Sequence, residues 1–583
     1  MFALFTSGCA TPPPRYTPES VAIPRTPPAD LLSAPPLQDS VELPAVPVVS
    51  GSFPLTRDGA LLTSLLNNKS IDVARLNPEI AQTAIPMARA EFDPEILATV
   101  SYGRDERMIG RLLSNRGTTV SSTSGSSTST SSSTTTSQIA TKATTAESLL
   151  QAATQLQNLE TTPTVSKAES AQGALTLQQK FPTGTVLFLT GSAIGADSNL
   201  ADSDHLGVLT VGVEQPLLEG AGLAPNLVSL RQARNRAAQS EHLFRATVIE
   251  VLARVELTYW DLVLAEEVYG IREFGESLAQ EQLRYNEERF SAGKVIEGDV
   301  MAARAELASR HADLVSARAR LREHNISLVR LLNPASEKQW DITFAPVDPP
   351  EVVQTEHSAD ASEGLALVYR PELADARLEI ATSDLETLRA RNRLFPRLDL
   401  SASYASSSQG DGSGGYTHHL DEFDYDSVRV GLEFHTPILN RGEKAEYRRS
   451  QLITEQNERY LSDLEQETAA QVRRAIVAVE ETWERLKSSK EAVTSRTEQL
   501  RVAQGRFEAG KVTNLDLLIV QRDFLDARID EVTSRVRHIQ ALTALYTAEG
   551  TLLERRGVAL AAEDSTEDAT SSLSPVVVKG GQQ

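Results

Sequence analysis

Few residues in this chain of 583 have the types and spacing that support chemistry. The phosphate-binding GxxxxGK[ST] loop, the zinc-binding HExxH helix and the GxSxG nucleophile turn are all missing from the sequence. His418 and His419 are adjacent, and imidazole is a common metal ligand. Asp421 and Glu422 follow closely, but all four lie in a Gly- and Asp-rich connection between two expected strands. We interpret this connection as a solvated loop, and the sequence predicts no catalytic residue, no metal site and no obligatory cofactor.

Cys9 is the only cysteine, so the chain forms neither an internal disulfide nor a zinc site built on several cysteines. It follows a short apolar run and a Ser-Gly pair, and it precedes a proline-rich stretch. This arrangement is similar to the end of a bacterial lipoprotein signal, although its charged beginning is missing and Thr6 replaces the usual aliphatic residue. We expect residues 1–9 to be a truncated lipoprotein signal that is lipidated at Cys9. The alternative is an ordinary chain end with one chance cysteine.

The composition excludes further classes of protein. The 79 Asp and Glu residues outnumber the 57 Lys and Arg residues, giving a net charge of −22, whereas a nucleic-acid partner requires a basic surface. We therefore expect no nucleic-acid partner. No stretch approaches the ~18 consecutive apolar residues of a membrane-spanning helix, so any membrane insertion would depend on strands or on a lipid.

An internal repeat organises the chain. Arg289 to Val300 (RFSAGKVIEGDV) matches Arg506 to Leu517 (RFEAGKVTNLDL) at seven of twelve positions without a gap. Upstream, QPLLEG at Gln215 matches TPILNR at Thr436, and FDPEILATVSY matches FPRLDLSASY. The chain therefore consists of two diverged halves. The Pro-rich and Ser/Thr-rich stretches lie outside or within these halves and mark further segments. The predicted segments are a Pro-rich tether at 10–54, a first repeat at 55–333 with a Ser/Thr-rich loop insertion at about 117–170, a linker at 334–360, a second repeat at 361–555 and a disordered tail at 556–583.

Each half contains a long window without proline. None occurs between Pro225 and Pro334 or between Pro437 and Pro575, and Ala, Glu, Arg, Leu and Gln dominate both windows. Because proline breaks helices and these residues favour them, the windows predict long helices. Apolar residues also recur every seven positions, which predicts coiled-coil packing. The residues that follow this period are Val300, Leu307, Leu314, Leu321 and Leu328, and Leu518, Leu525, Val532, Ile539 and Tyr546.

The AGK motif breaks each window once. Gly293 and Gly510 can adopt the positive φ of a tight turn. Asp299 and Asp516 begin the returning helix, where a carboxylate suits the helix dipole. Each window therefore predicts a helical hairpin.

The arms of each hairpin have unequal lengths. The first arms, ~226–290 and ~443–507, would extend on the order of 100 Å, and the returning arms of about 38 residues only ~57 Å. The helix that opens each half, for example 363–394, would span ~48 Å and fill the difference.

Apolar and polar residues alternate in four shorter segments, 96–102, 209–214, 398–404 and 428–435. This period of two is typical of a transmembrane β-barrel, and a soluble half-buried sheet gives the same alternation. Four strands per chain are too few to close a barrel, whereas three chains would supply twelve. A further hairpin, Ala174 to Leu189 around an FPTG turn, either joins the sheet or decorates a loop.

The order of helix, strand, strand and helical hairpin, repeated twice, resembles the TolC-like outer-membrane efflux protein family over residues 55–555. The resemblance rests on the paired RF-x-AGK-V turns, the QPLLEGAG and TPILNRGE corners, and the FDP and FP strand starts. It implies a mixed α and β membrane protein in which a trimeric transmembrane β-barrel, with about four strands per chain, continues into a long α-helical coiled-coil periplasmic tunnel. It also implies a homotrimer in contact with outer-membrane lipid, a periplasmic adaptor protein and an inner-membrane pump. Some members are lipidated at an N-terminal cysteine.

The resemblance implies that the two turns form the periplasmic tips that contact the adaptor. The corresponding residues are Arg289, Phe290, Gly293, Lys294, Arg506, Phe507, Gly510 and Lys511. Asp299 and Asp516 are candidates for the tunnel mouth, and the alternative is that Asp516 only caps its helix. Some members carry a second Asp three positions later, where this chain has Ile519.

We therefore expect a passive outer-membrane conduit of an efflux or secretion system and no enzyme. A cytoplasmic coiled-coil scaffold would explain the heptads and the negative charge, but not the duplicated strands. A soluble periplasmic adaptor would need one hairpin between compact β-domains, which the repeat contradicts.

Overall fold

The structure is a computed structural model in which the chain divides into two compact units. The described residues are 15–24, 52–109, 164–198, 201–293, 295–336, 339–350, 352, 354, 357–411, 425–509 and 511–558. A helical unit consists of residues 1–91, 219–396 and 436–583, and a sheet unit consists of residues 92–218 and 397–435.

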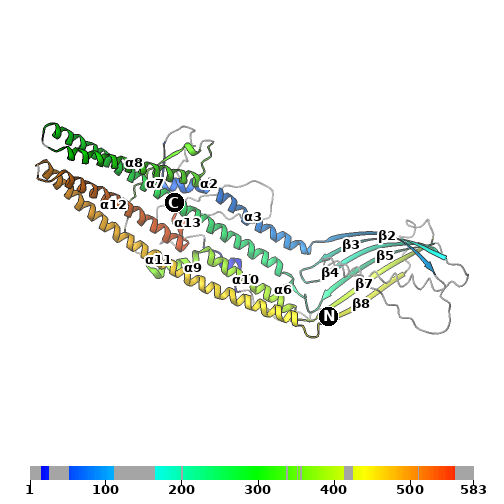
Figure 1. Cartoon of the computed structure of the whole chain (residues 1–583). Coiled ribbons are helices and arrows are strands. Elements are labelled where there is room, and N and C mark those ends of the chain that lie inside the picture. Colours follow the sequence, from blue (N-terminus) through cyan, green and yellow to red (C-terminus); the bar gives the residue numbers. More distant parts are fainter. Residues whose placement is uncertain are drawn as a thin grey trace, which may run out of the picture. The chain divides into compact units, whose positions relative to one another are not determined.

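Four long helices form two hairpins in the helical unit (Figure 1). The first hairpin consists of α7 (Val228–Ser291) and α8 (Glu297–Leu332), and the second of α11 (Arg441–Glu508) and α12 (Asn514–Glu549). The first arms have 64 and 68 residues, whereas both returning arms have 36. The expected hairpins and their unequal arms are therefore confirmed.

A pair of shorter helices opens each half. The pairs are α2 (Arg57–Asn67) with α3 (Lys69–Arg89), and α9 (Ala359–Tyr369) with α10 (Pro371–Asn392). α3 packs on α7, and α10 packs on both α7 and α11, so these helices fill the length that the returning arms leave open. The remaining short elements of the unit are α1 (Pro18–Val21), α6 (Leu223–Asn226), α13 (Leu552–Arg555), and the 3-10 turns η2 (Ala90–Phe92) and η3 (Gln339–Asp341).

The seven-residue period marks the packed side of the returning arms. In α12, Leu518, Leu525, Val532 and Ile539 are all buried. The two hairpins approach closely where Gly275 of α7 faces Leu525, because a Cβ at position 275 would lie 2.9 Å from Leu525 Cδ1. Among the helices that the structure describes, none has the length and hydropathy of a membrane-spanning segment.

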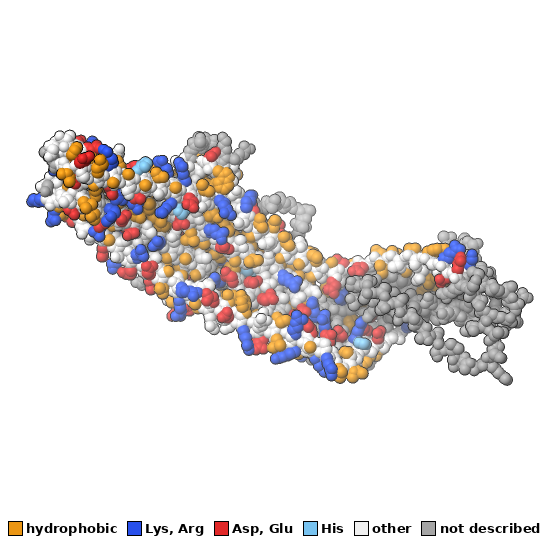
Figure 2. Space-filling view, viewed as in Figure 1, with side chains coloured by type: hydrophobic (Ala, Val, Ile, Leu, Met, Phe, Trp, Pro, Cys, Tyr) orange, Lys and Arg blue, Asp and Glu red, His pale blue; other side chains and the backbone are white. Residues whose placement is uncertain are grey.

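The largest hydrophobic cluster joins both halves of the chain. It includes Leu61 of α2, Leu252 and Tyr259 of α7, Leu328 of α8 and Val536 of α12. Away from this cluster, Lys and Arg side chains alternate with Asp and Glu side chains over the surface seen in Figure 2. The helical unit thus combines an apolar interior with a surface of mixed charge.

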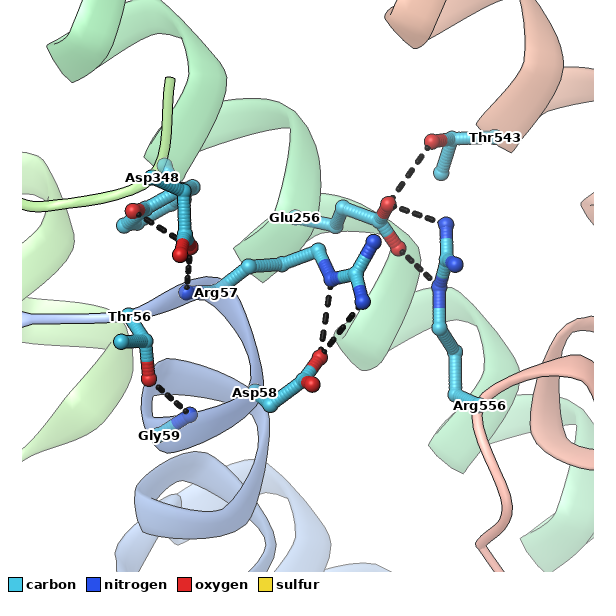
Figure 3. A network of polar contacts seen from close by, with 9 residues as sticks. Thr56, Arg57, Asp58, Gly59, Glu256, Asp348, Thr543 and Arg556 are labelled. Atoms are coloured by element: carbon cyan, nitrogen blue, oxygen red, sulfur yellow. Dashed lines mark hydrogen bonds and ion pairs between the residues drawn. The ribbon is translucent and has the colours of Figure 1, made fainter. Parts of the chain in front are cut away.

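A polar network ties a short parallel strand pair, β1 (Ser52–Leu55) and β6 (Thr343–Pro346), to the long helices. The Tyr259 hydroxyl donates to the Leu55 carbonyl oxygen at 3.1 Å and to the Asp348 carboxylate at 2.9 Å. The same carboxylate accepts the backbone N–H of Arg57 at 2.6 Å (Figure 3). Burial, followed by the charge of Asp348, raises the pKa of Tyr259, which keeps its hydroxyl a donor.

Glu256 of α7 is a buried charge in this network, with only 1% of its surface exposed. The guanidinium of Arg556 donates to both of its carboxylate oxygens, and the Thr543 hydroxyl donates to one of them at 3.1 Å (Figure 3). A buried carboxylate is tolerated only with such partners. Glu256 therefore links α7 to α12 and to the segment after α13.

The sheet unit is one antiparallel sheet with the strand order β2-β3-β4-β5-β7-β8. The strands are β2 (Glu95–Ile109), β3 (Thr164–Lys180), β4 (Val186–Ser198), β5 (Ala201–Pro216), β7 (Arg397–Asp411) and β8 (Tyr425–His435). The four strands predicted from the alternation correspond to β2, β5, β7 and β8.

The prediction of about four strands per chain is wrong, because the sheet has six. The hairpin around the FPTG turn, whose place the sequence left open, supplies β3 and β4 between β2 and β5. Its backbone groups are paired on both sides, from Glu95↔Gln178 to Ile109↔Thr164 on β2 and from Val186↔Glu214 onward on β5. In a surface loop, water would satisfy most of these groups in place of neighbouring strands. β3 begins at Thr164, so the strand overlaps the end of the predicted 117–170 insertion.

The register gives the sheet one apolar face. Directly paired residues share a face, and Leu177↔Leu189, Leu189↔Val211, Val211↔Tyr404 and Tyr404↔Val428 connect neighbouring strands. Large side chains on this apolar face are exposed, including Ile96, Val100, Tyr102, Leu175, Leu177, Leu189, Leu209, Val211, Tyr404, Val428, Val430 and Leu432.

Candidate functional site

The first hairpin turns tightly between α7 and α8. Gly293 has a φ of 69°, and its N–H donates to the Phe290 carbonyl oxygen at 2.9 Å. Glycine suits this left-handed conformation, as the sequence predicted. Lys294 lies outside the described residues.

The second hairpin turns in a similar way and adds a helix cap. The N–H of Lys511 donates to the Arg506 carbonyl oxygen at 2.8 Å, whereas Gly510 lies outside the described residues. Thr513 then begins α12 in a capping box with Asp516. The Asp516 N–H donates to the Thr513 hydroxyl at 3.2 Å, and that hydroxyl donates to the Asp516 carboxylate at 2.6 Å.

The two turns meet through their aromatic and basic residues. The guanidinium of Arg289 lies 5.4 Å from the ring centroid of Tyr285 and 5.8 Å from that of Phe507. The Tyr285 and Phe507 rings are 5.8 Å apart. Phe507 is 7% exposed and belongs to a cluster with Leu517 and other apolar residues of the second hairpin. Such cation–π and ring contacts stabilise the paired turns.

The repeated Arg-Phe pair is used differently in the two copies. In the first copy Arg289 is half-buried between rings and Phe290 is 47% exposed. In the second copy Phe507 is buried and Arg506 is exposed, as is Lys511. The structure therefore brings Arg289 and Phe507 together and leaves Phe290, Arg506 and Lys511 exposed.

A buried cluster of three amide side chains, which we name the amide cluster, lies behind the turns. The Gln282 and Asn286 side chains both donate to Asn514 Oδ1, at 2.9 Å and 3.1 Å. The Asn514 amide in turn donates to the Asp299 carbonyl oxygen at 3.4 Å. Asn286 is fully buried, and the other two are less than a tenth exposed. The cluster links α7, α8 and α12.

Sequence reasoning did not find the amide cluster. Asn514 stands four residues before the heptad residue Leu518, and Gln282 stands four residues before Asn286, so each pair shares one helix face. The only signal in the sequence for this cluster was therefore the spacing of these polar residues.

The two tunnel-mouth candidates differ in exposure. Asp516 is exposed in its helix cap, whereas Asp299 is half-buried in the first turn of α8.

The polar face of the sheet carries small hydroxyl and amide groups and a few ion pairs. The Thr176 and Thr190 hydroxyls are hydrogen-bonded across β3 and β4 at 3.0 Å. Near one end of β7, Arg397 pairs with Asp399 at 2.5 Å and with Glu214 at 3.8 Å. The single cation partly compensates the two carboxylates, and this polar face suits contact with water.

Cys9 and the adjacent His418 and His419 lie outside the described residues. Within the described part of the chain, no group of three or more His, Cys, Asp or Glu residues is placed to hold a metal ion.

Proteins similar in sequence come from bacterial export systems. The proteases secretion protein PrtF of Dickeya chrysanthemi is 24% identical over 357 residues, covering 61% of this chain and 75% of PrtF. The pyoverdine export outer membrane protein OpmQ of Pseudomonas aeruginosa is 26% identical over 327 residues, covering 55% of this chain and 66% of OpmQ.

Solved channel structures share the fold. The CmeC outer membrane channel of Campylobacter jejuni superimposes with a TM-score of 0.60 at 15% identity, covering 85% of this chain and 86% of CmeC. The outer membrane protein VceC of Vibrio cholerae gives a TM-score of 0.57 at 14% identity, covering 85% of this chain and 96% of VceC.

The family model for outer membrane efflux proteins matches residues 187–334 and 364–551, one segment in each half of the chain. These segments contain β4, β5 and the helical hairpin of the first half, and β7, β8 and the hairpin of the second. Together they cover more than half of the sequence, so the chain belongs to the outer membrane efflux protein family, whose members are non-enzymatic channels of the outer membrane.

Proposed function

We propose that three copies of this outer-membrane channel protein form a passive conduit, through which cargo leaves the periplasm while a partner pump supplies the energy. The three sheet units would share one barrel in the outer membrane, and the six helical hairpins would line a periplasmic tunnel. The cytoplasmic scaffold considered from the sequence is excluded by membership of the family.

The observation that carries this proposal is the continuous apolar face of the sheet. Its side chains are exposed even on the inner strands, with Leu175 at 56% and Val211 at 42%. A soluble sheet would bury such a face against a second layer, whereas lipid covers it without any further protein. The proposed lipid partner follows from this exposure.

The polar face supports passive conduction. It offers short hydroxyl and amide groups and ion pairs, such as Arg397 with Asp399, and we expect these groups to bind no solute strongly. A channel lined in this way lets cargo enter and leave without a tight binding step.

The exposed residues of the two turns support docking of a periplasmic adaptor. Phe290, Arg506 and Lys511 present one apolar and two basic side chains, a combination that suits a partner surface with an acidic rim. Adaptor contact would favour a state in which the turns separate and the amide cluster opens, a shift between two conformations.

Cell fractionation and planar-bilayer recording test the proposal. We expect the protein in the outer membrane as a heat-resistant trimer, and we expect conductance to rise in a Phe507→Ala variant, which loosens the turns. A monomer without lipid, or a trimer that stays silent even in this variant, would contradict the conduit.

A further inference from the structure

The hairpin β3–β4 is a full member of the sheet. β2 pairs with β3 along all 15 of its residues, and β3 pairs with β4 from Ala168↔Ser198 to Lys180↔Val186. β4 pairs in turn with β5 up to Val186↔Glu214. No strand of the hairpin has a free edge within this described sheet.

The hairpin also continues both faces of the sheet. Leu175 and Leu189 lie on the apolar face and are 56% and 41% exposed. Thr176 and Thr190 lie on the polar face and bond to each other. A hairpin that merely decorated a loop would need no lipid-facing leucines, so these strands have the pattern of membrane-crossing strands.

The exposed side chains distinguish the two edge strands from the inner ones. On the apolar face, Val100 of β2 and Val428 of β8 are 89% and 76% exposed, whereas Leu189 and Val211 of the inner strands are 41% and 42% exposed. The edge strands therefore lack a neighbour on one side. In a membrane their free N–H and C=O groups require a partner strand.

The number of strands decides how the edges can meet. Because all neighbours are antiparallel and six is even, β2 and β8 run in opposite directions. A β8 edge can therefore pair in antiparallel fashion with the β2 edge of a neighbouring copy. The inserted hairpin preserves this relationship, since it adds two strands.

We propose that three copies close a barrel of eighteen strands, in which β8 of each copy pairs with β2 of the next. This inference rests on the proposed trimer. With a strand spacing of ~4.8 Å and a tilt of about 40°, eighteen strands give a backbone diameter of ~36 Å, compared with ~24 Å for twelve. The cross-section of the barrel is thus roughly twice that of a twelve-stranded ring.

Counting strands in the purified trimer by electron cryo-microscopy tests this inference directly. We expect a ring of eighteen. A ring of twelve with β3 and β4 outside it would overturn the inference and leave the trimeric channel standing. The absence of any closed ring would overturn the proposed function as well.

Thiol crosslinking in intact membranes gives a second, independent test on the full chain. The register places Thr99 opposite Ala174, Ala174 opposite Ser192, and Ser192 opposite Val208, all on the polar face. With a short reagent, a Thr99→Cys/Ala174→Cys variant should crosslink. A Thr99→Cys/Val208→Cys variant should not, because three strand spacings, ~14 Å, separate these positions. The opposite result, in which only the second pair reacts, would show that β2 and β5 are neighbours and would refute the eighteen-stranded barrel.

Discussion

Arg289 of the first hairpin lies over the ring of Phe507 of the second, with 5.8 Å between the guanidinium carbon and the ring centroid. These residues come from opposite positions of the repeated Arg-Phe pair. The counterparts Phe290 and Arg506 are exposed. The duplicated turn is therefore divided into residues that join the two hairpins and residues that face outward.

This division predicts different effects for the two phenylalanines. Phe507→Ala removes a buried ring and its contact with Arg289, and we expect a local loss of about 3 kcal/mol. Hydrogen exchange should accelerate in the turns and conductance should rise. Phe290→Ala is the matched control, because its side chain is 47% exposed. The Phe290→Ala variant should leave the hydrogen-exchange rates of the turns unchanged and weaken only the proposed adaptor binding. Equal exchange rates in the two variants would show that the two phenylalanines do not have different roles.

The amide cluster predicts a cost for replacing Asn514. Asn514→Leu leaves the buried side chains of Gln282 and Asn286 without their shared acceptor, which we expect to cost about 2 kcal/mol. Protease cleavage near the turns is a suitable measurement. Leu515→Ala, at a neighbouring exposed position, should cleave like the wild type. Resistance of the Asn514→Leu variant would mean that the cluster does not hold the hairpins together.

The buried pair of Glu256 and Arg556 predicts a larger effect on stability. Arg556→Met leaves a buried carboxylate without its cation, and we expect a loss of about 3 kcal/mol. Adding Glu256→Gln should restore part of the thermal stability, because the unpaired charge is then absent. The exposed pair of Arg254 and Glu250 is the control, and Arg254→Met should change stability by less than about 0.5 kcal/mol.

His242 of α7 predicts a dependence on pH. Burial, and then the charge of Arg245, lowers the pKa of His242 to about 4 from its ordinary value of 6.5. The unfolded chain therefore binds a proton between these pH values when the folded chain does not, so stability falls on acidification. We expect His242 to contribute a loss of about 2 kcal/mol at pH 4.5 relative to pH 7.5. The melting temperatures of the wild type and of the His242→Gln variant, compared at both pH values, measure this difference. An equal decrease in melting temperature for both proteins on acidification would show that His242 makes no such contribution.

The two faces of the sheet predict opposite tolerance to charge. Val430→Lys puts a cation on the apolar face, where lipid contact costs about 2–4 kcal/mol in mid-membrane. The yield of heat-resistant trimer should fall sharply. Ser403→Lys places the same side chain on the polar face of β7, and its yield should stay near that of the wild type.

Much of the helical unit could be predicted because its signals are local. The absence of proline over long windows and the repeated AGK turns located α7, α8, α11 and α12 to within a few residues. The strands β2, β5, β7 and β8 were equally accessible through alternation. These features depend on the chain's own periodicity and not on distant contacts.

The place of the hairpin β3–β4 could not be predicted for a physical reason. Its apolar face includes Ala171, Gly173, Gly191 and Ala193 beside the leucines, so alternation there is weak. Whether such a hairpin joins a sheet depends on partners far away in sequence. The amide cluster could not be predicted for the same reason, because Asn286 and Asn514 are 228 positions apart. The residue type gives no help either, since asparagine is usually exposed.

Gly275 has a mechanical consequence for opening. Because position 275 has no side chain, α7 packs closely against Leu525 of α12, and a Cβ at that position would lie 2.9 Å from Leu525 Cδ1. The end of α7 at Ser291 lies roughly 24 Å farther along the helix. If the hairpins separate as we propose, a small rotation at this contact would move the ends of α7 and α12 near the turns by a larger distance.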